Sequence, residues 1–217
     1  VLSKEFSLEN GEILKKAAAN MSNGQAELIS MGMQEFAELL PTLKNDEALG
    51  FGIHDGERYA HCVGIRIKSN AQPDQGILAR TKEYFKYAHG PGMLMLDNDP
   101  SGEHSIDPVR LMAYLTTICP QLKKVDYVTR GSVSAGVHKT GQKPVKSQGF
   151  HIYFGVNRAD DVPRIGAVLF NRLWLLGLGY ITISSAGTML LRTPIDAAVF
   201  SPERLDFAGK PVLKSDG

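Results

Sequence analysis

Two aspartates follow a short apolar segment of the chain and are separated by one residue. Asp97 and Asp99 come directly after residues 92–96 (GMLML), a continuous apolar run of the length of a buried central strand. Because side chains alternate along a strand, both carboxylates project to the same face, while Asn98 points away. Carboxylates this close repel each other, and a bound Mg²⁺ or Mn²⁺ relieves the repulsion because these cations prefer oxygen ligands. The pair therefore predicts a divalent-cation site.

A third aspartate, Asp196, stands in an otherwise apolar segment, residues 195–200 (IDAAVF), which we predict to be a strand. A lone acid among apolar neighbours needs a charged partner or a metal. Arg192 is the nearby partner, and the pair Asp97 and Asp99 is the metal site that Asp196 would join. By itself an Asp-x-Asp pair is a weak signal, because the sequence Asp-Asn-Asp-Pro-Ser-Gly is also typical of a solvated turn.

Two histidines follow a glycine at the same spacing, in Gly149-Phe150-His151 and Gly136-Val137-His138. His151 opens an alternating segment, residues 151–156 (HIYFGV), that predicts a strand with Tyr153 on the same face. His138 stands among loop-forming residues, which favour a solvated position. We therefore expect His151 beside the acids, with a hydrogen-bonded core histidine as the alternative.

In chain order these features are Asp-x-Asp at a strand end, Gly-x-His at a strand start and a hydrophobic residue followed by Asp196. This order and its flanks resemble the archaeo-eukaryotic primase superfamily, particularly primase-polymerase domains encoded by plasmids, phages and integrated mobile elements. The resemblance covers about residues 48–207. It implies a DNA-directed nucleotidyltransferase in which Asp97, Asp99 and Asp196 bind Mg²⁺ or Mn²⁺. His151 matches the histidine that contacts the phosphates of the incoming nucleotide.

The run of residues 173–209 (LWLLGLGYITISSAGTMLLRTPIDAAVFSPERLDFAG) looks like the mobile-element branch in particular. The chain departs from many relatives at Gly149, because they have serine two residues before the histidine. Ser147, or the pair Ser132 and Ser134, is expected to replace that serine. Further nucleotide contacts are expected from Lys146 and Arg192.

Basic residues crowd the segment of residues 130–148, whose Gly, Ser and Lys content predicts an extended hairpin or loop. Each phosphate that such cations neutralise adds to the salt dependence of DNA binding. A solubilising hairpin is the alternative interpretation. The residues that we expect to contact template DNA are Arg130, Lys139 and Lys143.

The elements that must position these residues have recognisable boundaries. Asp107 and Pro108 predict a helix start, and that helix stops before Pro120, while Pro163 opens a second helix. Strands interrupted by two such helices predict an α+β fold, with helices packed on a mixed or antiparallel sheet. By the resemblance, this is the primase catalytic core with its RRM-like palm. We expect the segments that carry Asp97, His151 and Asp196 to be strands of one sheet.

The chain of 217 residues has a formal net charge of +1 and only two cysteines, far apart, so neither a global basic field nor a disulfide framework is expected. We predict a single catalytic domain over residues 1–217, with an N-terminal part (1–47), a motif-bearing core (48–207) and a tail (208–217). The first residue is not Met and the tail is mostly polar, which suggests a fragment of a longer protein.

The expected partners follow from the resemblance and from the apolar pattern. They are a single-stranded DNA template, ribo- or deoxyribonucleoside triphosphates and a helicase domain or subunit. No stretch of about 18 apolar residues or signal peptide occurs, so we expect no membrane contact and a cytoplasmic location.

Two other functions stay open. One is a rolling-circle replication nuclease or relaxase, which is disfavoured because His151-Ile152-Tyr153 has one histidine where such enzymes typically have two. The other is a non-catalytic initiator that binds single-stranded DNA.

Overall fold

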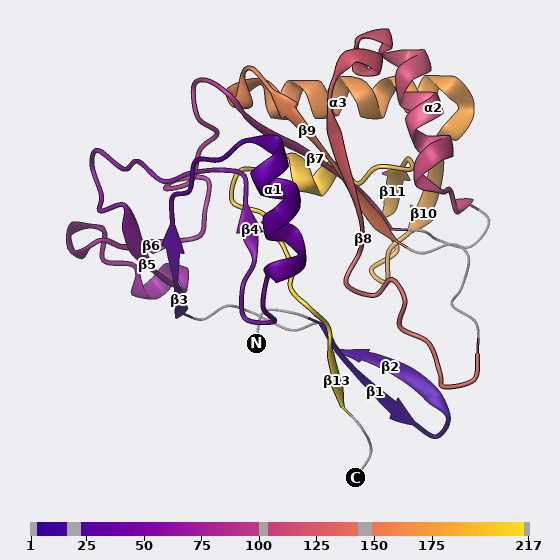
Figure 1. The fold of residues 1–217 in the computed structure, drawn as a ribbon, viewed down its shortest axis with the longest axis horizontal. Helices are drawn as coiled ribbons and strands as arrows, with labels where there is room; N and C mark the ends of the chain where they lie inside the picture. The colour runs from indigo at the N-terminus through magenta and orange to yellow at the C-terminus, as the bar shows by residue number, and fades with distance from the viewer. Residues whose placement is uncertain (1–3, 17–22, 100–103, 143–148, 215–217) are drawn as a thin grey trace. The chain divides into compact units, whose positions relative to one another are not determined.

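The computed structural model describes residues 4–16, 23–99, 104–142 and 149–214. The chain is of mixed α+β class, with small antiparallel and mixed sheets and few helices (Figure 1). It divides into two compact units: the first comprises residues 1–89 and 201–217, and the second comprises residues 90–200. The three acids and His151 all belong to the second unit. Among the described residues, no helix is long and apolar enough to cross a membrane.

The second unit is built on an antiparallel sheet with strand order β7-β9-β8 (Figure 1). Its apolar side chains are buried, including Leu94 and Leu96 of β7 and Ile152 and Phe154 of β9. Helices α2 and α3 pack against each other, and α3 also packs on β7. The bounds of these elements are Gly92–Asn98 (β7), Tyr127–Gly131 (β8), Phe150–Val156 (β9), Pro108–Ile118 (α2) and Val162–Leu173 (α3).

Helix α2 begins where the sequence predicts, and α3 begins at Val162, one residue before the predicted start at Pro163. The Asp107 side chain caps α2 by accepting a hydrogen bond of 2.9 Å from the backbone N–H of Arg110, and Pro108 takes the first helical position. In α3, Gly166 leaves room for the ring of Phe200, since an added Cβ would lie 2.3 Å from that ring. Shorter helical turns flank these helices: Pro120–Lys124 (η5), Ala159–Asp161 (η6) and Trp174–Leu178 (η7).

The rest of the second unit is a hairpin of β10 (Tyr180–Ile183) and β11 (Met189–Arg192), followed by a 3₁₀ turn, η8 (Ala197–Phe200). The prediction of a strand over residues 195–200 is therefore wrong. Thr193 Oγ1 bonds both the N–H and the C=O of Ile195, and Pro194 has no N–H to donate. These local bonds replace the ladder bonds of a strand. Asp196 accepts a bond of 3.0 Å from the N–H of Ala198 and so opens the 3₁₀ turn.

The first unit contains three small sheets, with strand orders β13-β1-β2, β3-β5-β6 and β12-β4. A buried cluster of Val63, Ile65, Leu78 and Phe85 forms its centre. Its helical elements are Met33–Leu39 (α1), Leu40–Thr42 (η1), Lys68–Asn70 (η2) and Pro73–Gln75 (η3). Its strands are Glu5–Glu9 (β1), Glu12–Lys16 (β2), Asn23–Glu27 (β3), Leu49–Gly50 (β4), Cys62–Arg66 (β5), Ile77–Ala79 (β6), Leu205–Asp206 (β12) and Val212–Lys214 (β13).

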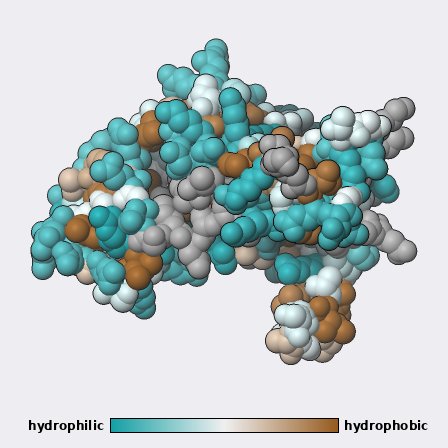
Figure 2. All heavy atoms as spheres, turned by 90° about the horizontal axis from the view of Figure 1, so that it is seen from below, coloured by the Kyte–Doolittle hydropathy of each residue, from teal (hydrophilic) through white to brown (hydrophobic). Residues whose placement is uncertain are grey.

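Hydrophilic residues cover most of the face shown in Figure 2, and apolar residues lie in separate patches. Within the described residues, two hairpins carry much of the exposed apolar surface. The side chains concerned are Leu8, Ile13 and Leu14 of the β1–β2 hairpin and Ile181, Ile183, Met189 and Leu191 of the β10–β11 hairpin.

Candidate active site

Two hydrogen bonds hold the segment before η8 against the end of β7. The backbone N–H of Asp196 donates to the carbonyl oxygen of Asp97 over 2.8 Å. The buried side chain of Asn98 donates from Nδ2 to the carbonyl oxygen of Pro194 over 2.7 Å. Asp196 is thus beside Asp97 although the two acids are far apart in the sequence and Asp196 is not in a strand.

An open hollow of about 350 Å³ lies at this junction. Asp99, Asp196 and Arg192 supply its charged lining, and β10 contributes Tyr180 and Thr182. Asp99 is exposed, so its carboxylate is accessible to a ligand. The hollow thus has two of the three predicted acids in its wall, and the third is joined to Asp196 through the backbone. The remaining lining residues are Phe170, Leu191, Thr193, Pro194, Ile195 and Ala197.

His151 lies directly against the first of the acids. It is the cross-strand partner of Asp97, and its Nε2 is 3.3 Å from Asp97 Oδ1. The other ring nitrogen, Nδ1, is 3.1 Å from the hydroxyl of Tyr153, which is fully buried. His138, in contrast, is exposed in the loop after β8, with its Nδ1 2.6 Å from the carbonyl oxygen of Gly136.

Arg130 extends this arrangement to the third strand of the sheet. Arg130 is on β8 and is a cross-strand partner of His151 on β9. Asp97, on β7, is the partner of His151 on the other side. Directly opposed residues of an antiparallel sheet share a face, so Asp97, His151 and Arg130 form one row on one face. The imidazole and the guanidinium of this row can donate to an anionic ligand, whereas the carboxylate of Asp97 suits a cation.

Arg192 also lies close to an acid of the site. Its Nη1 is 3.7 Å from Asp196 Oδ1, and its Nε donates to Thr182 Oγ1 over 3.5 Å. Both side chains of the ion pair are over one third exposed, at 40% and 36%. An exposed pair of this kind contributes little to stability, so Arg192 can exchange Asp196 for a ligand at small cost.

Ser132 lies next to Gly149, the position at which the resemblance leads us to expect a serine. A Cβ added to Gly149 would lie 2.8 Å from Ser132 Oγ, so the hydroxyl of Ser132 occupies the space next to that glycine. Ser132 also accepts or donates a hydrogen bond of 3.1 Å with Ser134, and its N–H donates to the carbonyl oxygen of Gly149. Of the two replacements that the sequence suggests, the pair Ser132 and Ser134 is thereby beside the start of β9.

The other predicted contacts are on or near the connection between β8 and β9. Lys139 follows His138 in this connection and is partly exposed. Lys143, Lys146 and Ser147 lie outside the described residues.

Sequence reasoning missed Asn98 and Thr193 as the residues that fix the position of Asp196. An asparagine on the buried face of a predicted strand end was the available signal, because a buried amide must find hydrogen-bond partners.

The donor chemistry of the acids fits a hard divalent cation, since three carboxylates provide the oxygen ligands that Mg²⁺ and Mn²⁺ prefer. In their present conformations the side chains are engaged elsewhere: Asp97 with His151, and Asp196 with Arg192 and the N–H of Ala198. In the part of the chain that the structure describes, no three His, Cys, Asp or Glu side chains are grouped as a preformed metal site. A cation would therefore bind after these side chains turn toward it.

No protein-family model, curated protein or solved structure matches this chain. What the site does must therefore be argued from its own residues.

Proposed function

We propose that this chain is the catalytic domain of a DNA primase-polymerase, a metal-dependent nucleotidyltransferase with the core fold of the archaeo-eukaryotic primases. One observation carries the proposal. The hydrogen bond from Asp196 to Asp97 joins two acids that the sequence motifs pair but that the chain separates widely. Asp99 and Asp196 then share the wall of one hollow, as residues that bind a common ligand should.

In this proposal Asp97, Asp99 and Asp196 hold Mg²⁺ or Mn²⁺. Two bound cations supply positive charge to the attacking and leaving oxygens of phosphoryl transfer. His151, whose Nε2 is 3.3 Å from Asp97 Oδ1, would supply a donor to the triphosphate. Arg192 offers its guanidinium to the same phosphates, because its bond with Asp196 is exposed and weak.

The partly buried Arg130, together with Lys139 and Lys143, is proposed to bind the phosphates of a single-stranded template. Ser132, Ser147 and Lys146 are proposed to act on the nucleotide. The expected setting is replication of a mobile element in the cytoplasm, together with a helicase domain or subunit.

Incorporation of labelled nucleotides on a primed single-stranded template, with Mn²⁺ or Mg²⁺, tests the proposal. Asp97→Asn and Asp99→Asn should each abolish incorporation, because each removes a charged cation ligand while keeping the side-chain volume. Asp74→Asn, a change in the 3₁₀ turn η3 of the first unit, is the matched control and should leave the rate unchanged.

Direct Mn²⁺ binding, followed by electron paramagnetic resonance, provides a second readout. Each of the two site variants should weaken Mn²⁺ binding, and the Asp74 variant should not. Incorporation that survives both site changes would remove the polymerase assignment. Metal-dependent cleavage of single-stranded DNA without incorporation would favour the rolling-circle nuclease, and template binding with neither reaction would favour a non-catalytic initiator.

A further inference from the structure

An aromatic side chain with no part in the proposed metal chemistry lies in the wall of the hollow beside the acids. Tyr180, the first residue of β10, lines this hollow together with Asp99, Arg192 and Asp196. It is the cross-strand partner of Arg192 on β11, so the two side chains lie on the same face of the hairpin. The Tyr180 side chain is half-buried, which leaves part of it accessible to a ligand in the hollow.

The ring of Tyr180 already stacks with another flat ring. The centroid of the His104 imidazole lies 3.8 Å from that of the Tyr180 ring, with 10° between the two planes. Nucleobases stack on aromatic side chains in the same parallel manner, and an imidazole is the five-membered ring of a purine. The face of Tyr180 that His104 covers can therefore accept a base in its place.

The two partners of this stack differ in how firmly they are held. His104 is exposed, and among the described residues no hydrogen bond or ion pair holds its ring. Tyr180, in contrast, follows Gly179, where an added Cβ would collide with the indole of Trp174, so the start of β10 packs closely on that indole. A single aromatic pair contributes only modestly to stability. Tyr180 is therefore the fixed ring and His104 the replaceable one.

We propose that the ring of Tyr180 stacks with the base of a nucleotide whose phosphates bind Arg192, and that the base takes the place of the His104 imidazole. A base is one sugar away from its own phosphate, and Tyr180 and Arg192 are directly opposed, so one nucleotide can reach both. The acids of the same hollow would hold the cation that accompanies the triphosphate. The choice of a nucleotide as ligand rests on the proposed function, and the stacking rests on the geometry of the two rings.

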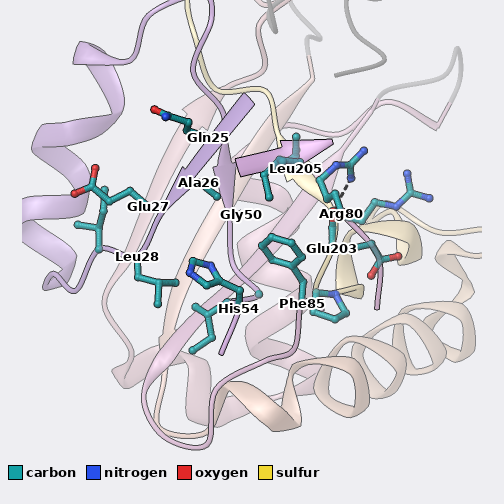
Figure 3. Close-up of a pocket in the computed structure, with 16 residues that line it drawn as sticks. Gln25, Ala26, Glu27, Leu28, Gly50, His54, Arg80, Phe85, Glu203 and Leu205 are labelled. Carbon is teal, nitrogen blue, oxygen red and sulfur yellow. Dashed lines mark hydrogen bonds between the residues drawn. The ribbon is translucent and has the colours of Figure 1, made fainter. Parts of the chain in front are cut away.

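A hollow of about 150 Å³ in the first unit is the other place where a base could lie (Figure 3). Phe85, an aromatic ring of its lining, is buried and meets the His54 ring at 70° between planes, so it offers little surface for stacking. Arg80 is hydrogen-bonded to the carbonyl oxygen of Glu203, as Figure 3 shows. Ala26→Leu, which fills this hollow from β3, should therefore leave nucleotide binding unchanged.

Titration calorimetry of the full chain with dATP and Mn²⁺, in the absence of template, tests the proposal. Tripolyphosphate, which has the phosphates without a base, is the ligand control. Tyr180→Leu should weaken dATP binding about tenfold, because the stacking face is lost, and should leave tripolyphosphate binding unchanged. Tyr180→Phe keeps the ring and should bind dATP as the wild type does. Tyr127→Leu, at an exposed tyrosine of β8, is the matched control.

The replacement of His104 has two tests of its own. In His104→Ala the base has no imidazole to displace, so dATP should bind at least as tightly as it does to the wild type. Proton spectra of the wild-type chain give a second readout, because the Tyr180 ring shifts the signals of a stacked imidazole upfield. On dATP binding these His104 signals should move downfield, toward those of an unstacked imidazole. This readout remains decisive if Tyr180→Leu does not fold.

Several results would overturn the proposal. They are the absence of saturable dATP binding, equal dATP affinity in Tyr180→Leu and the wild type, weaker dATP binding in His104→Ala, and His104 signals that dATP does not move. Loss of dATP binding in Ala26→Leu would place the base in the first unit instead. A single-stranded oligonucleotide whose binding depends on Tyr180, when dATP binding does not, would place a template base on the ring.

The fate of the proposed function is separate, because dATP binding requires no turnover. Stacking of dATP on Tyr180 without incorporation in the wild-type chain would uphold the role of the ring and reject the polymerase. Incorporation with a KM for dATP that Tyr180→Leu does not raise would uphold the polymerase and reject the role of the ring.

Discussion

At the scale of single residues, Asp97 and Tyr153 together favour one tautomer of His151. An ionised Asp97 only accepts, so the neutral His151 ring carries its proton on Nε2, and Tyr153 donates to Nδ1. Tyr153→Phe removes the donor to Nδ1 and should raise the fraction of the tautomer with its proton on Nδ1, visible in nitrogen-15 spectra of labelled histidine. Tyr127→Phe, on the exposed part of β8, is the control.

The same change should raise the KM for nucleotide more than it lowers kcat, because it loosens the orientation of a phosphate-binding donor without removing it. An unchanged tautomer in the Tyr153 variant would show that Asp97 alone orients the ring. The alternation of side chains along a strand places His151 and Tyr153 on one face, but it does not determine whether their side chains touch. The contact of the Tyr153 hydroxyl with His151 was therefore not predictable from the sequence.

Tyr87 gives the first unit a pH dependence in the alkaline range. Burial raises its pKa to about 12, with a smaller contribution from the charge of Glu203. The folded state therefore keeps the phenol neutral while the unfolded state ionises from about pH 10. Stability should be full below pH 10 and fall between pH 10 and 12, because the unfolded state loses its proton first. Urea unfolding at pH 9 and pH 11 should show a smaller loss in Tyr87→Phe than in the wild type, and equal losses would rule this explanation out.

At the scale of elements, the side chain of Asn98 ties the segment before η8 to β7. Asn98→Ala should lower the free energy of unfolding by about 1–3 kcal/mol, because the buried carbonyl of Pro194 loses its donor. It should also slow nucleotide incorporation, since Asp196 would be held only by its own backbone bond. Asn171→Ala, at an exposed position of α3, is the control. A stability change without any loss of incorporation would mean that Asp196 keeps its place unaided.

Elements with strong local signals were predictable from the sequence. The apolar run before Asp97 and the alternation after His151 gave β7 and β9, and Asp107 with Pro108 gave the start of α2. The segment around Asp196 was not predictable in this way, because its apolar residues favour a strand. The Thr193 side chain and Pro194 decide against that strand through local hydrogen bonding and a missing N–H. The proximity of Asp196 to Asp97 is a tertiary contact, which the motif order suggested and no local pattern encodes.

At the scale of the whole molecule, charge is nearly balanced, with 24 Lys and Arg against 23 Asp and Glu. Any affinity for DNA must therefore come from a few local cations rather than from a general field. The acids and the described part of the basic connection after β8 belong to the second unit.

Salt dependence measures how many of these local cations contact the template. For single-stranded DNA the logarithm of the binding constant falls with the logarithm of salt concentration, with a slope of about −0.7 per neutralised phosphate. Arg130→Ala and Lys139→Ala should each reduce the magnitude of this slope by about 0.7 in fluorescence anisotropy titrations. Lys68→Ala, an exposed position of the first unit, should leave it unchanged. Removing a cation that contacts no phosphate does not change the number of counterions released on binding. A slope that neither site variant alters would therefore mean that the template binds elsewhere and that the connection between β8 and β9 is a solvated hairpin.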